Sequence, residues 1–280
     1  MTNLKQFVML GAAGYIAPKH MKAIKDVGGD LIACLDPHDS VGVLDSYFPN
    51  CKYFSEFERF DRYCSMQDID YCVVCSPNYL HFGQCVWAME NGMSIICEKP
   101  TVLTTDELEK LITIEQEAGN KVWSILQLRL NDTVNKFRAH QGDSGWINIK
   151  YHTPRGPWYT TSWKGAVLKS GGLATAIGIH LFDLLLWLFG PAYKIISWYN
   201  SPTFCEGSVF IGNFDIKIEL SIEWTDNPMR LFSINGVDFE LSKSFVDLHT
   251  LSYRKILSGS GVGLEDIRLA VELCEKLQNY

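Results

Sequence analysis

The first 120 residues alternate short apolar runs with helix-compatible segments, the order typical of parallel βαβ units with helices on both faces of a sheet. Residues 7–10 and 31–35 are predicted to be strands, separated by a helix over residues 14–27. Further strands are expected at residues 71–75 and 94–97, and further helices at residues 79–91 and 105–118, the last with Thr104 or Thr105 as its N-cap. We therefore expect a doubly wound parallel sheet of the Rossmann type here.

Beyond residue 122 aromatic residues become dense and runs of alternating polarity dominate. Strands are expected at residues 146–152, 195–199, 209–224 and 231–241, turns at Gly212-Asn213 and Asn235-Gly236, and helices at residues 173–189 and 264–278. The chain is thus expected to be α/β, with a Rossmann domain over residues 1–122 and an α+β domain with an open, mainly antiparallel sheet over residues 123–280. The cleft between the domains is the expected ligand site, and the C-terminal helix could pack back on the first domain.

Charge and composition exclude several classes of protein. The chain has 32 acidic and 25 basic residues, a net charge of −7, and no basic run, which argues against nucleic acid and anionic membranes as partners and favours a small molecule. The apolar run before Gly11 is too short for a signal sequence, and no uninterrupted apolar stretch approaches membrane-spanning length, so a cytoplasmic location is expected. The nine cysteines are scattered and odd in number, so they are expected to be reduced core thiols. Cys72 and Cys75 form a C-x-x-C, but strand geometry sends them to opposite faces, which argues against a redox or metal role.

A small-residue turn, Gly11-Ala12-Ala13-Gly14-Tyr15-Ile16-Ala17, separates the first strand from the first helix. Such a turn lets backbone amides approach a pyrophosphate at the helix N-terminus. Asp36, 25 positions after Gly11, ends the second strand, where a carboxylate bonds a ribose 2′-hydroxyl and repels a 2′-phosphate. The expected cofactor is therefore NAD rather than NADP. The spacing is one residue longer than the usual fingerprint, so a slightly different turn is expected.

Two further polar segments follow buried strands, at the edge where ligands of open α/β sheets collect. Ser76-Pro77-Asn78 follows the predicted strand at 71–75, although the same residues could simply cap the next helix. Glu98-Lys99-Pro100 follows the strand at 94–97. A lysine at this position could act as an acid or base, and a cis peptide could precede Pro100.

These segments, together with Gly171-Gly172 and with Gly178-Ile179-His180 and Asp183, resemble the Gfo/Idh/MocA oxidoreductase family. Within it the sequence looks like the bacterial WlbA and WbpB type, which oxidises C3 of UDP-N-acetylglucosaminuronic acid. The stretches that carry this resemblance span nearly the whole chain and are residues 11–18, 39–42, 76–81, 126–130, 155–165 and 245–253.

The resemblance implies that Lys99 and His180 flank the C3 hydroxyl and that hydride passes to C4 of the nicotinamide. Oxidation of an unactivated alcohol needs a base within reach of the hydroxyl proton, and Lys99 is the better candidate, with His180 sharing or relaying the proton. Alternatively, His180 is a satisfied histidine on an apolar helix. Asp183, three residues later, could orient the imidazole or anchor the helix. No metal is expected.

A UDP-uronate needs cations for its diphosphate and carboxylate and aromatic faces for its rings. One glycine-bounded loop, residues 155–165, offers both, although such side chains could also be core aromatics and solvated surface charges. Ala176 stands where many relatives have Asp and the C3-oxidising group has Asn, and Thr175 is the expected substitute. The expected cofactor-binding residues are Gly11, Ala13, Gly14, Tyr15, Ile16, Asp36, Ser76, Pro77, Asn78, His81, Glu98, Lys99 and Gln127, and the expected substrate-binding residues are Lys99, Arg129, Arg155, Tyr159, Trp163, Lys164, Thr175 and His180.

The expected function is therefore NAD-dependent oxidation of the C3 hydroxyl of UDP-N-acetylglucosaminuronic acid to the 3-keto sugar. This step would precede a transaminase in the synthesis of bacterial surface polysaccharide. One alternative is an oxidoreductase of the same family acting on another nucleotide sugar or on a free sugar. Another, suggested by Ala176, is a catalytically silent NAD-binding regulatory protein. An exposed apolar face on the second sheet is expected to join subunits into a homodimer or homotetramer.

Overall fold

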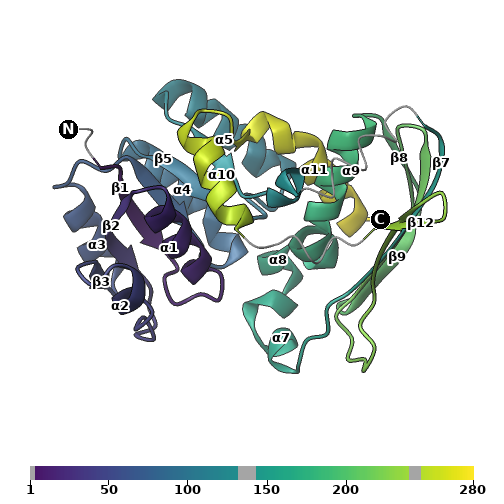
Figure 1. Cartoon of the computed structure of the whole chain (residues 1–280), viewed down its shortest axis with the longest axis horizontal. Helices are drawn as coiled ribbons and strands as arrows, with labels where there is room; N and C mark the ends of the chain where they lie inside the picture. Colours follow the sequence, from purple (N-terminus) through teal and green to yellow (C-terminus); the bar gives the residue numbers. More distant parts are fainter. Residues whose placement is uncertain (1–3, 132–142, 240–246) are drawn as a thin grey trace. The chain divides into compact units, whose positions relative to one another are not determined.

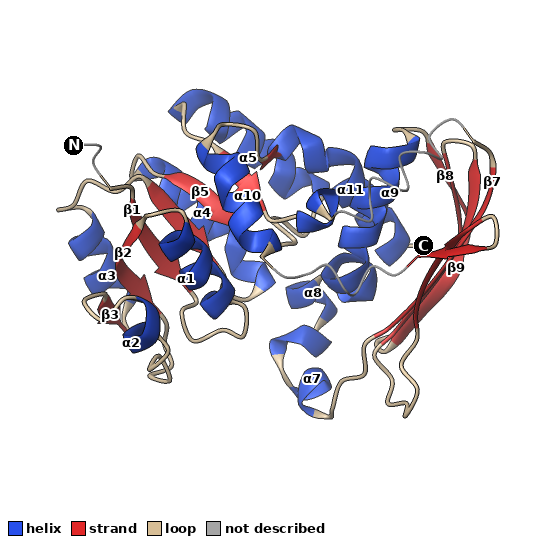
Figure 2. Ribbon diagram, viewed as in Figure 1, coloured by secondary structure: helices blue, strands red, loops and turns tan. Residues whose placement is uncertain are grey.

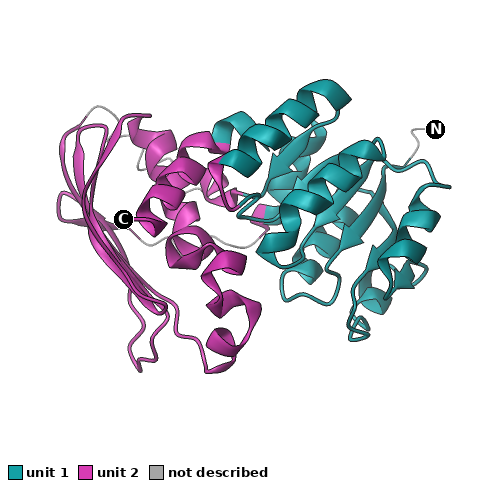
Figure 3. Ribbon diagram, turned by 180° about the vertical axis from the view of Figure 1, so that it is seen from behind, with its two compact units in different colours: residues 1–102, 106–125, 249–266 teal, residues 103–105, 126–248, 267–280 magenta. Residues whose placement is uncertain are grey.

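The computed structural model describes residues 4–131, 143–239 and 247–280, which divide into two compact units (Figure 3). Unit 1 comprises residues 1–102, 106–125 and 249–266, and unit 2 comprises residues 103–105, 126–248 and 267–280. The chain therefore passes out of unit 1 after residue 125 and returns to it at residue 249, whereas the sequence suggested a single division after residue 122. The predicted strand at 231–241 and the stretch 245–253 extend into residues outside those described.

Unit 1 is built on a seven-stranded sheet that is parallel except at one edge (Figure 1). In spatial order its strands are β13 (Val262–Gly263), β6 (Val122–Ser124), β5 (Ser94–Cys97), β4 (Tyr71–Val74), β1 (Gln6–Leu10), β2 (Asp30–Leu35) and β3 (Lys52–Phe54). β13 pairs antiparallel with β6, and every other neighbouring pair is parallel. The strand order reverses at β1, which is the point where open α/β sheets bind their ligands. The predicted doubly wound sheet is confirmed.

Helices cover this sheet, and the central strands are accordingly apolar after a first residue that is polar in β1, β2 and β5 (Figure 2). Phe7, Val8, Met9 and Leu10 of β1 are all fully buried. The helical segments of unit 1 are α1 (Ala17–Asp26), α2 (Leu44–Tyr47), α3 (Phe57–Cys64), η1 (Asn78–Leu80), α4 (His81–Glu90), α5 (Thr105–Ala118) and α10 (Leu248–Leu257). All nine cysteines of the chain are free thiols, and all but Cys51 are buried, as expected for reduced core residues.

Unit 2 contains a six-stranded sheet that is mainly antiparallel, as predicted. In spatial order its strands are β12 (Val237–Phe239), β11 (Arg230–Ile234), β7 (Gly145–His152), β10 (Phe214–Ser221), β9 (Phe204–Ile211) and β8 (Tyr193–Asn200). Only the central pair, β7 with β10, runs parallel. Asn235 and Gly236, both with positive φ, form the predicted tight turn between β11 and β12.

The main helix of unit 2 is α9 (Ile179–Phe189), which continues from a π-helical turn, η4 (Ala174–Gly178), where the sequence predicted one regular helix. The stretch Val167–Phe189 contains an 18-residue window with a mean hydropathy of 1.8 and by length and composition could cross a membrane, although Lys169, His180 and Asp183 interrupt its apolar run. However, 67% of its apolar window is buried inside the structure, and two glycines with positive φ, Gly171 and Gly172, interrupt it. This is the arrangement of a helix in a protein core. The remaining helical segments are η2 (Gln127–Leu130), α7 (Trp158–Thr161), η3 (Trp163–Gly165), α8 (Val167–Ser170) and α11 (Leu264–Gln278).

Candidate functional site

The turn between β1 and α1 brings its backbone against the end of β4. Gly11 has a φ of +88°, and a Cβ there would lie 2.6 Å from the backbone nitrogen of Ser76, so only glycine fits. The Gly11 N–H donates to the carbonyl oxygen of Leu35, which ties the turn to β2. Pro18 lies in the first turn of α1, and that turn has no acidic side chain. The helix N-terminus can therefore attract an anion such as a pyrophosphate.

Asp36 follows β2, and its carboxylate is held against the same turn. Oδ2 accepts a hydrogen bond from the Ala13 N–H (2.9 Å), and Oδ1 accepts one from the His38 N–H (2.9 Å). A carboxylate oxygen has more than one lone pair, so these bonds leave acceptor capacity for a hydroxyl donor. The Ala13 amide is thus already used by Asp36. Tyr15 in the same turn is 93% exposed.

The loop after β4 is tied to the segment after β5 by one histidine. His81, the first residue of α4, is buried, with Nδ1 2.7 Å from the Pro100 carbonyl oxygen and Nε2 2.8 Å from the Ser76 carbonyl oxygen. Burial lowers the pKa of His81, although both carbonyls favour the protonated ring. Both ring nitrogens of this predicted cofactor residue are therefore occupied within unit 1. Asn78, three residues earlier, is buried as well.

Glu98, Lys99 and Pro100 follow β5, and the Lys99–Pro100 peptide is cis, as predicted. The buried Glu98 carboxylate accepts hydrogen bonds at Oε1 from Nε2 of His20 (3.0 Å) and of His249 (3.2 Å), and at Oε2 from the Lys99 N–H (3.1 Å). Burial by itself raises the pKa of Glu98, but the bonds from the two histidines outweigh it and hold the pKa well below its usual value. Glu98 thus has protein partners at both carboxylate oxygens, and its predicted cofactor contact stays a prediction.

In unit 2, His180 is the second residue of α9, two positions after the π-helical turn η4 ends at Gly178. Such turns are rare and are frequent at functional sites. Thr175 lies within the turn and is buried, and a Cβ at Gly171 would lie 2.7 Å from its Cβ. Ala176 and His180 are both partly exposed. One short helical stretch therefore carries the predicted residues Thr175 and His180 together with Ala176.

Arg129, in η2, is bound to Asp183 of α9 by two hydrogen bonds. Nε donates to Oδ2 (2.9 Å) and Nη2 donates to Oδ1 (2.5 Å). The guanidinium also lies over the ring of Trp187, 5.6 Å from its centroid. Arg129 therefore anchors η2 to α9, and its predicted contact with substrate stays a prediction. The ion pair supports the anchoring role considered for Asp183, and the role of orienting His180 stays a prediction.

Gln127, at the start of η2, has an unusual buried acceptor. Its Oε1 atom is buried and has no hydrogen-bond partner among the residues that the structure describes. An unpaired buried acceptor is costly, so such atoms commonly take a donor from a bound molecule or water. This observation fits the predicted ligand contact of Gln127.

The predicted substrate loop, residues 155–165, contains two short helical segments, α7 and η3, and α8 follows it. Arg155 before them is exposed, whereas Tyr159 is buried and packs edge-on against Trp158. Burial raises the pKa of Tyr159, although the charge of Arg155 opposes the shift. The Lys164 ammonium lies 4.0 Å from the centroid of the Trp163 ring, a cation–π contact. The loop therefore offers two cations and aromatic faces, while the Tyr159 ring belongs mainly to the packing.

Three residues around Lys99 were not foreseen from sequence: His20, His249 and Tyr253. His20 and His249 bond Glu98 and Tyr253 bonds His20, although all three lie far from Glu98 in sequence. His249 and Tyr253 lie in the stretch 245–253 that carries the family resemblance, but nothing in that stretch indicates their partner. The structure brings Gly11, Asp36, Ser76 and Lys99 to the carboxyl ends of neighbouring parallel strands in unit 1. Arg129, Arg155, Trp163, Lys164, Thr175 and His180 all belong to unit 2.

Comparison with known proteins identifies both halves of the chain. Residues 5–125 match the family model described as "Oxidoreductase family, NAD-binding Rossmann fold" of the Gfo/Idh/MocA proteins, and residues 145–209 match the C-terminal alpha/beta domain model of the same family. Among curated proteins, the chain is 24% identical over 220 residues to 2,7-anhydro-N-acetylneuraminate hydratase from Mediterraneibacter gnavus. That match covers 76% of this chain and 57% of the hydratase, so the chain spans little more than half of that relative.

Two solved structures are similar over almost their whole length. The WlbA (WbpB) dehydrogenase from Thermus thermophilus in complex with NAD and alpha-ketoglutarate is 38% identical, with a TM-score of 0.92, and the match covers 98% of this chain and 95% of that one. A second structure of the Thermus thermophilus dehydrogenase, in complex with NAD and UDP-GlcNAcA, is 37% identical, with a TM-score of 0.90 and the same coverage.

Proposed function

Because the chain belongs to the Gfo/Idh/MocA oxidoreductase family, with its NAD-binding Rossmann fold, we propose that it oxidises the C3 hydroxyl of UDP-N-acetylglucosaminuronic acid to the 3-keto sugar with NAD. The observation that carries this proposal is the similarity to the Thermus thermophilus dehydrogenase solved with NAD and UDP-GlcNAcA, which extends over 98% of this chain. Specificity depends on side chains rather than on the fold, so the proposal also requires each reactive group to be present.

Unit 1 fits NAD. The Gly11 turn, the N-terminus of α1 without acidic residues and the amide-held carboxylate of Asp36 are the features that a dinucleotide needs. The negative charge of Asp36 would repel a 2′-phosphate and thus disfavour NADP. When bound, NAD accepts the hydride from C3 of the sugar. The proposed contacts come from Gly11, Ala13, Gly14, Tyr15, Ile16, Asp36, Ser76, Pro77, Asn78, Lys99 and Gln127.

Lys99 is the proposed base. As the C3–H bond breaks, the hydroxyl O–H must also break for the carbonyl to form, and the Lys99 amine takes that proton. His180 is the proposed second group at the hydroxyl, where its imidazole shares the proton. Oxidation thus releases one hydride and one proton, and the residues of this chain need to handle only the proton.

The uronate and diphosphate are proposed to bind Arg155 and Lys164, with Trp163 as an aromatic face. Thr175, in the π-helical turn, is proposed as a polar contact to the sugar, and Tyr159 shapes the loop by packing. Arg129 is proposed to contribute indirectly, because Asp183 occupies its guanidinium.

A second candidate function is oxidation of a different nucleotide sugar, and Ala176 favours it. An alanine side chain cannot hydrogen-bond a hydroxyl, so the contact around the reacting carbon differs from one made by an amide or carboxylate. The two candidates differ in the sugar and share the cofactor and the Lys99 base.

The test is NADH formation, followed by its absorbance, after mixing purified protein with NAD and UDP-N-acetylglucosaminuronic acid. UDP-N-acetylglucosamine, which lacks the carboxylate, is the matched control substrate. We expect turnover with the uronate, little with the control, and none in Lys99→Ala, which should still bind NAD. Turnover of another nucleotide sugar in preference to the uronate would favour the second candidate, and binding of NAD without any turnover would contradict both.

The cellular setting is also part of the proposal. Nine free thiols, eight of them buried, fit a reducing compartment such as the cytoplasm. The 3-keto product is a substrate for a transaminase, which places the reaction before amino-group transfer in the synthesis of surface polysaccharide.

Exposed aromatic residues on the second sheet, among them Trp146, Tyr199 and Phe210, support a homodimer or homotetramer.

A further inference from the structure

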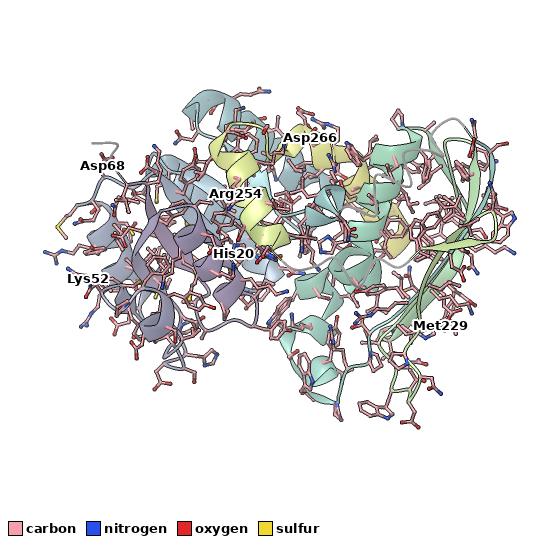
Figure 4. All side chains as sticks on the ribbon, in the orientation of Figure 1. His20, Lys52, Asp68, Met229, Arg254 and Asp266 are labelled. Atoms are coloured by element: carbon pink, nitrogen blue, oxygen red, sulfur yellow. The ribbon has the colours of Figure 1, made fainter. Side chains whose placement is uncertain are left out.

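Unit 1 contains a buried polar network that is bonded to the backbone of Lys99. Its centre is the Glu98 carboxylate, whose Oε1 accepts hydrogen bonds from Nε2 of both His20 and His249. His20, labelled in Figure 4, lies on α1, and its Nδ1 is 2.8 Å from the hydroxyl oxygen of Tyr253. His249 and Tyr253 both belong to α10, and their rings contact the ring of His20 edge-on. Three segments far apart in sequence thus converge on one carboxylate.

The proton positions in this network follow from what each group can do. An ionised carboxylate only accepts, so each histidine must donate from Nε2. Burial lowers the pKa of His20, and a neutral His20 that donates from Nε2 must accept at Nδ1. Burial raises the pKa of Tyr253 well above its usual value, so its hydroxyl stays protonated and supplies that hydrogen bond. The chain of donors therefore runs from Tyr253 through His20 to Glu98.

The other oxygen of Glu98 joins this network to the reactive turn. Oε2 accepts the backbone N–H of Lys99, the residue that carries the proposed base. Buried charged groups of this kind stabilise a fold less than apolar residues of the same volume, but they fix geometry when every partner is satisfied. A misplacement of about 1 Å in a reacting group costs roughly 100-fold in rate, so the orientation of this turn matters for proton removal.

We propose that His20, His249 and Tyr253 are positioning residues that fix the Glu98 carboxylate and, through it, the backbone turn that carries Lys99. The proposal rests on the proposed role of Lys99 as the base. It assigns to α10 a function in catalysis, although none of its residues is proposed to touch the substrate.

The test compares three substitutions on α10. His249→Leu removes the donor to Glu98, and His249→Gln keeps an N–H donor at a similar reach. Thr250→Val is the matched control, because Thr250 is the next residue on the same helix and donates to Asp26 rather than to Glu98. We expect kcat to fall by about 10- to 100-fold in His249→Leu, with KM for NAD within about threefold, since Lys99 is only one of the proposed NAD contacts and the Gly11 turn and Asp36 are unchanged. His249→Gln should recover most of the kcat, and Thr250→Val should match the wild type.

A second readout does not depend on the substrate. The rate at which acetic anhydride labels the Lys99 amine, relative to exposed Lys19, is measured by peptide mass spectrometry in each variant. We expect a changed ratio in His249→Leu and in Tyr253→Phe, and the wild-type ratio in His249→Gln and Thr250→Val. Tyr253→Phe loses only one hydroxyl, so it serves if His249→Leu does not fold. In the wild type, ¹⁵N spectra of the imidazoles should show the Nε2–H form for both His20 and His249.

Several results would overturn the proposal. They are equal activity and labelling in His249→Leu and His249→Gln, equal damage in Thr250→Val, or an Nδ1–H form of His249. The three ligand atoms of His20, Glu98 and His249 lie within 4.8 Å of one another, so stoichiometric zinc in the purified protein would also overturn it. If the wild type makes no NADH from the uronate but the labelling ratios and spectra are as expected, the proposed function fails and the positioning role stands.

Discussion

Arg129 and Asp183 form a buried two-point ion pair, in which the two side chains are only 11% and 1% exposed. The pair joins η2 to α9, and His180 lies on α9 one turn before Asp183. Two parallel N–H to carboxylate bonds fix both distance and orientation, which a single bond does not. The ion pair therefore fixes the position of η2, which contains Gln127, relative to α9, which carries the proposed catalytic histidine, within unit 2.

Breaking this pair should destabilise the protein strongly. Asp183→Ala leaves the buried Arg129 guanidinium without its carboxylate, and we expect the free energy of unfolding in urea to fall by about 3–5 kcal/mol. Glu56→Ala is the control, because it breaks an ion pair with Arg59 in which both side chains are largely exposed, and it should leave the urea midpoint unchanged. A wild-type urea midpoint for Asp183→Ala would show that the ion pair does not contribute this much to the free energy of unfolding.

Gly11→Ala should weaken NAD binding through a close backbone contact. The new Cβ would lie 2.6 Å from the Ser76 nitrogen, so the turn must move away from β4. Gly28→Ala is the matched control, since Gly28 also has a positive φ but has nothing within 4 Å of a new Cβ. Both variants carry backbone strain, but we expect only Gly11→Ala to raise the Kd for NAD, by about tenfold or more, in calorimetric titrations. Equal Kd values in the two variants would contradict this reasoning.

Asp36→Asn should relax the choice of cofactor. The amide oxygen can still accept the Ala13 N–H, but the negative charge that repels a 2′-phosphate is lost. We expect the ratio of kcat/KM with NAD to that with NADP to fall by about tenfold or more. Asp39→Asn removes an exposed charge three residues away and should leave the ratio unchanged. If the NAD/NADP ratio of kcat/KM were unaltered in Asp36→Asn, the Asp36 carboxylate would not determine the choice of cofactor.

Stability should fall as the pH drops from about 7.5 to about 5. His20 and His81 are buried, and burial lowers their pKa values below the ordinary 6.5. The unfolded chain therefore takes up protons at a higher pH than the folded chain does, which favours unfolding below about pH 6.5. The lowered pKa of Glu98 acts in the same direction below its ordinary value of 4.5. Urea unfolding at several pH values measures this. A flat profile over this pH range would refute the account.

The local sequence pattern was sufficient to predict helices and strands whose ends are marked by a residue that stops the element. The strand at Ser94–Cys97 and the helices at Thr105–Ala118 and Leu264–Gln278 were predicted at their observed bounds. Each combines a strong apolar pattern with a nearby stop such as Gly119 or Glu98. The hairpin at Asn235-Gly236 was predictable for the same reason, because those residues suit the positive φ values of its turn.

Long-range pairing was not readable from sequence. β13 is only two residues long and exists because Val262 and Gly263 pair with β6, more than 130 positions earlier. The π-helical turn before His180 has the same apolar pattern as an ordinary helix, so periodicity could not reveal it. The partners of Glu98 and of Arg129 were missed because the sequence around a charged side chain does not indicate which distant residue it contacts in the fold. Resemblance to a family singled out Lys99 and His180 as candidate catalytic residues. The fold was needed to find the residues that bond the segments carrying them.

The return of residues 249–266 to unit 1 affects how the protein is made. A ribosome releases the first 125 residues long before α10 and β13 exist. During that interval β6 has an uncovered edge, and Glu98 lacks the His249 donor that helps keep its charge in a buried position. Chains that stop before residue 262 would lack β13 and keep the open edge, which is a site for aggregation or proteolysis. Completion of the nucleotide-binding unit therefore waits for residues 249–266, which are synthesised after residues 126–248 of unit 2.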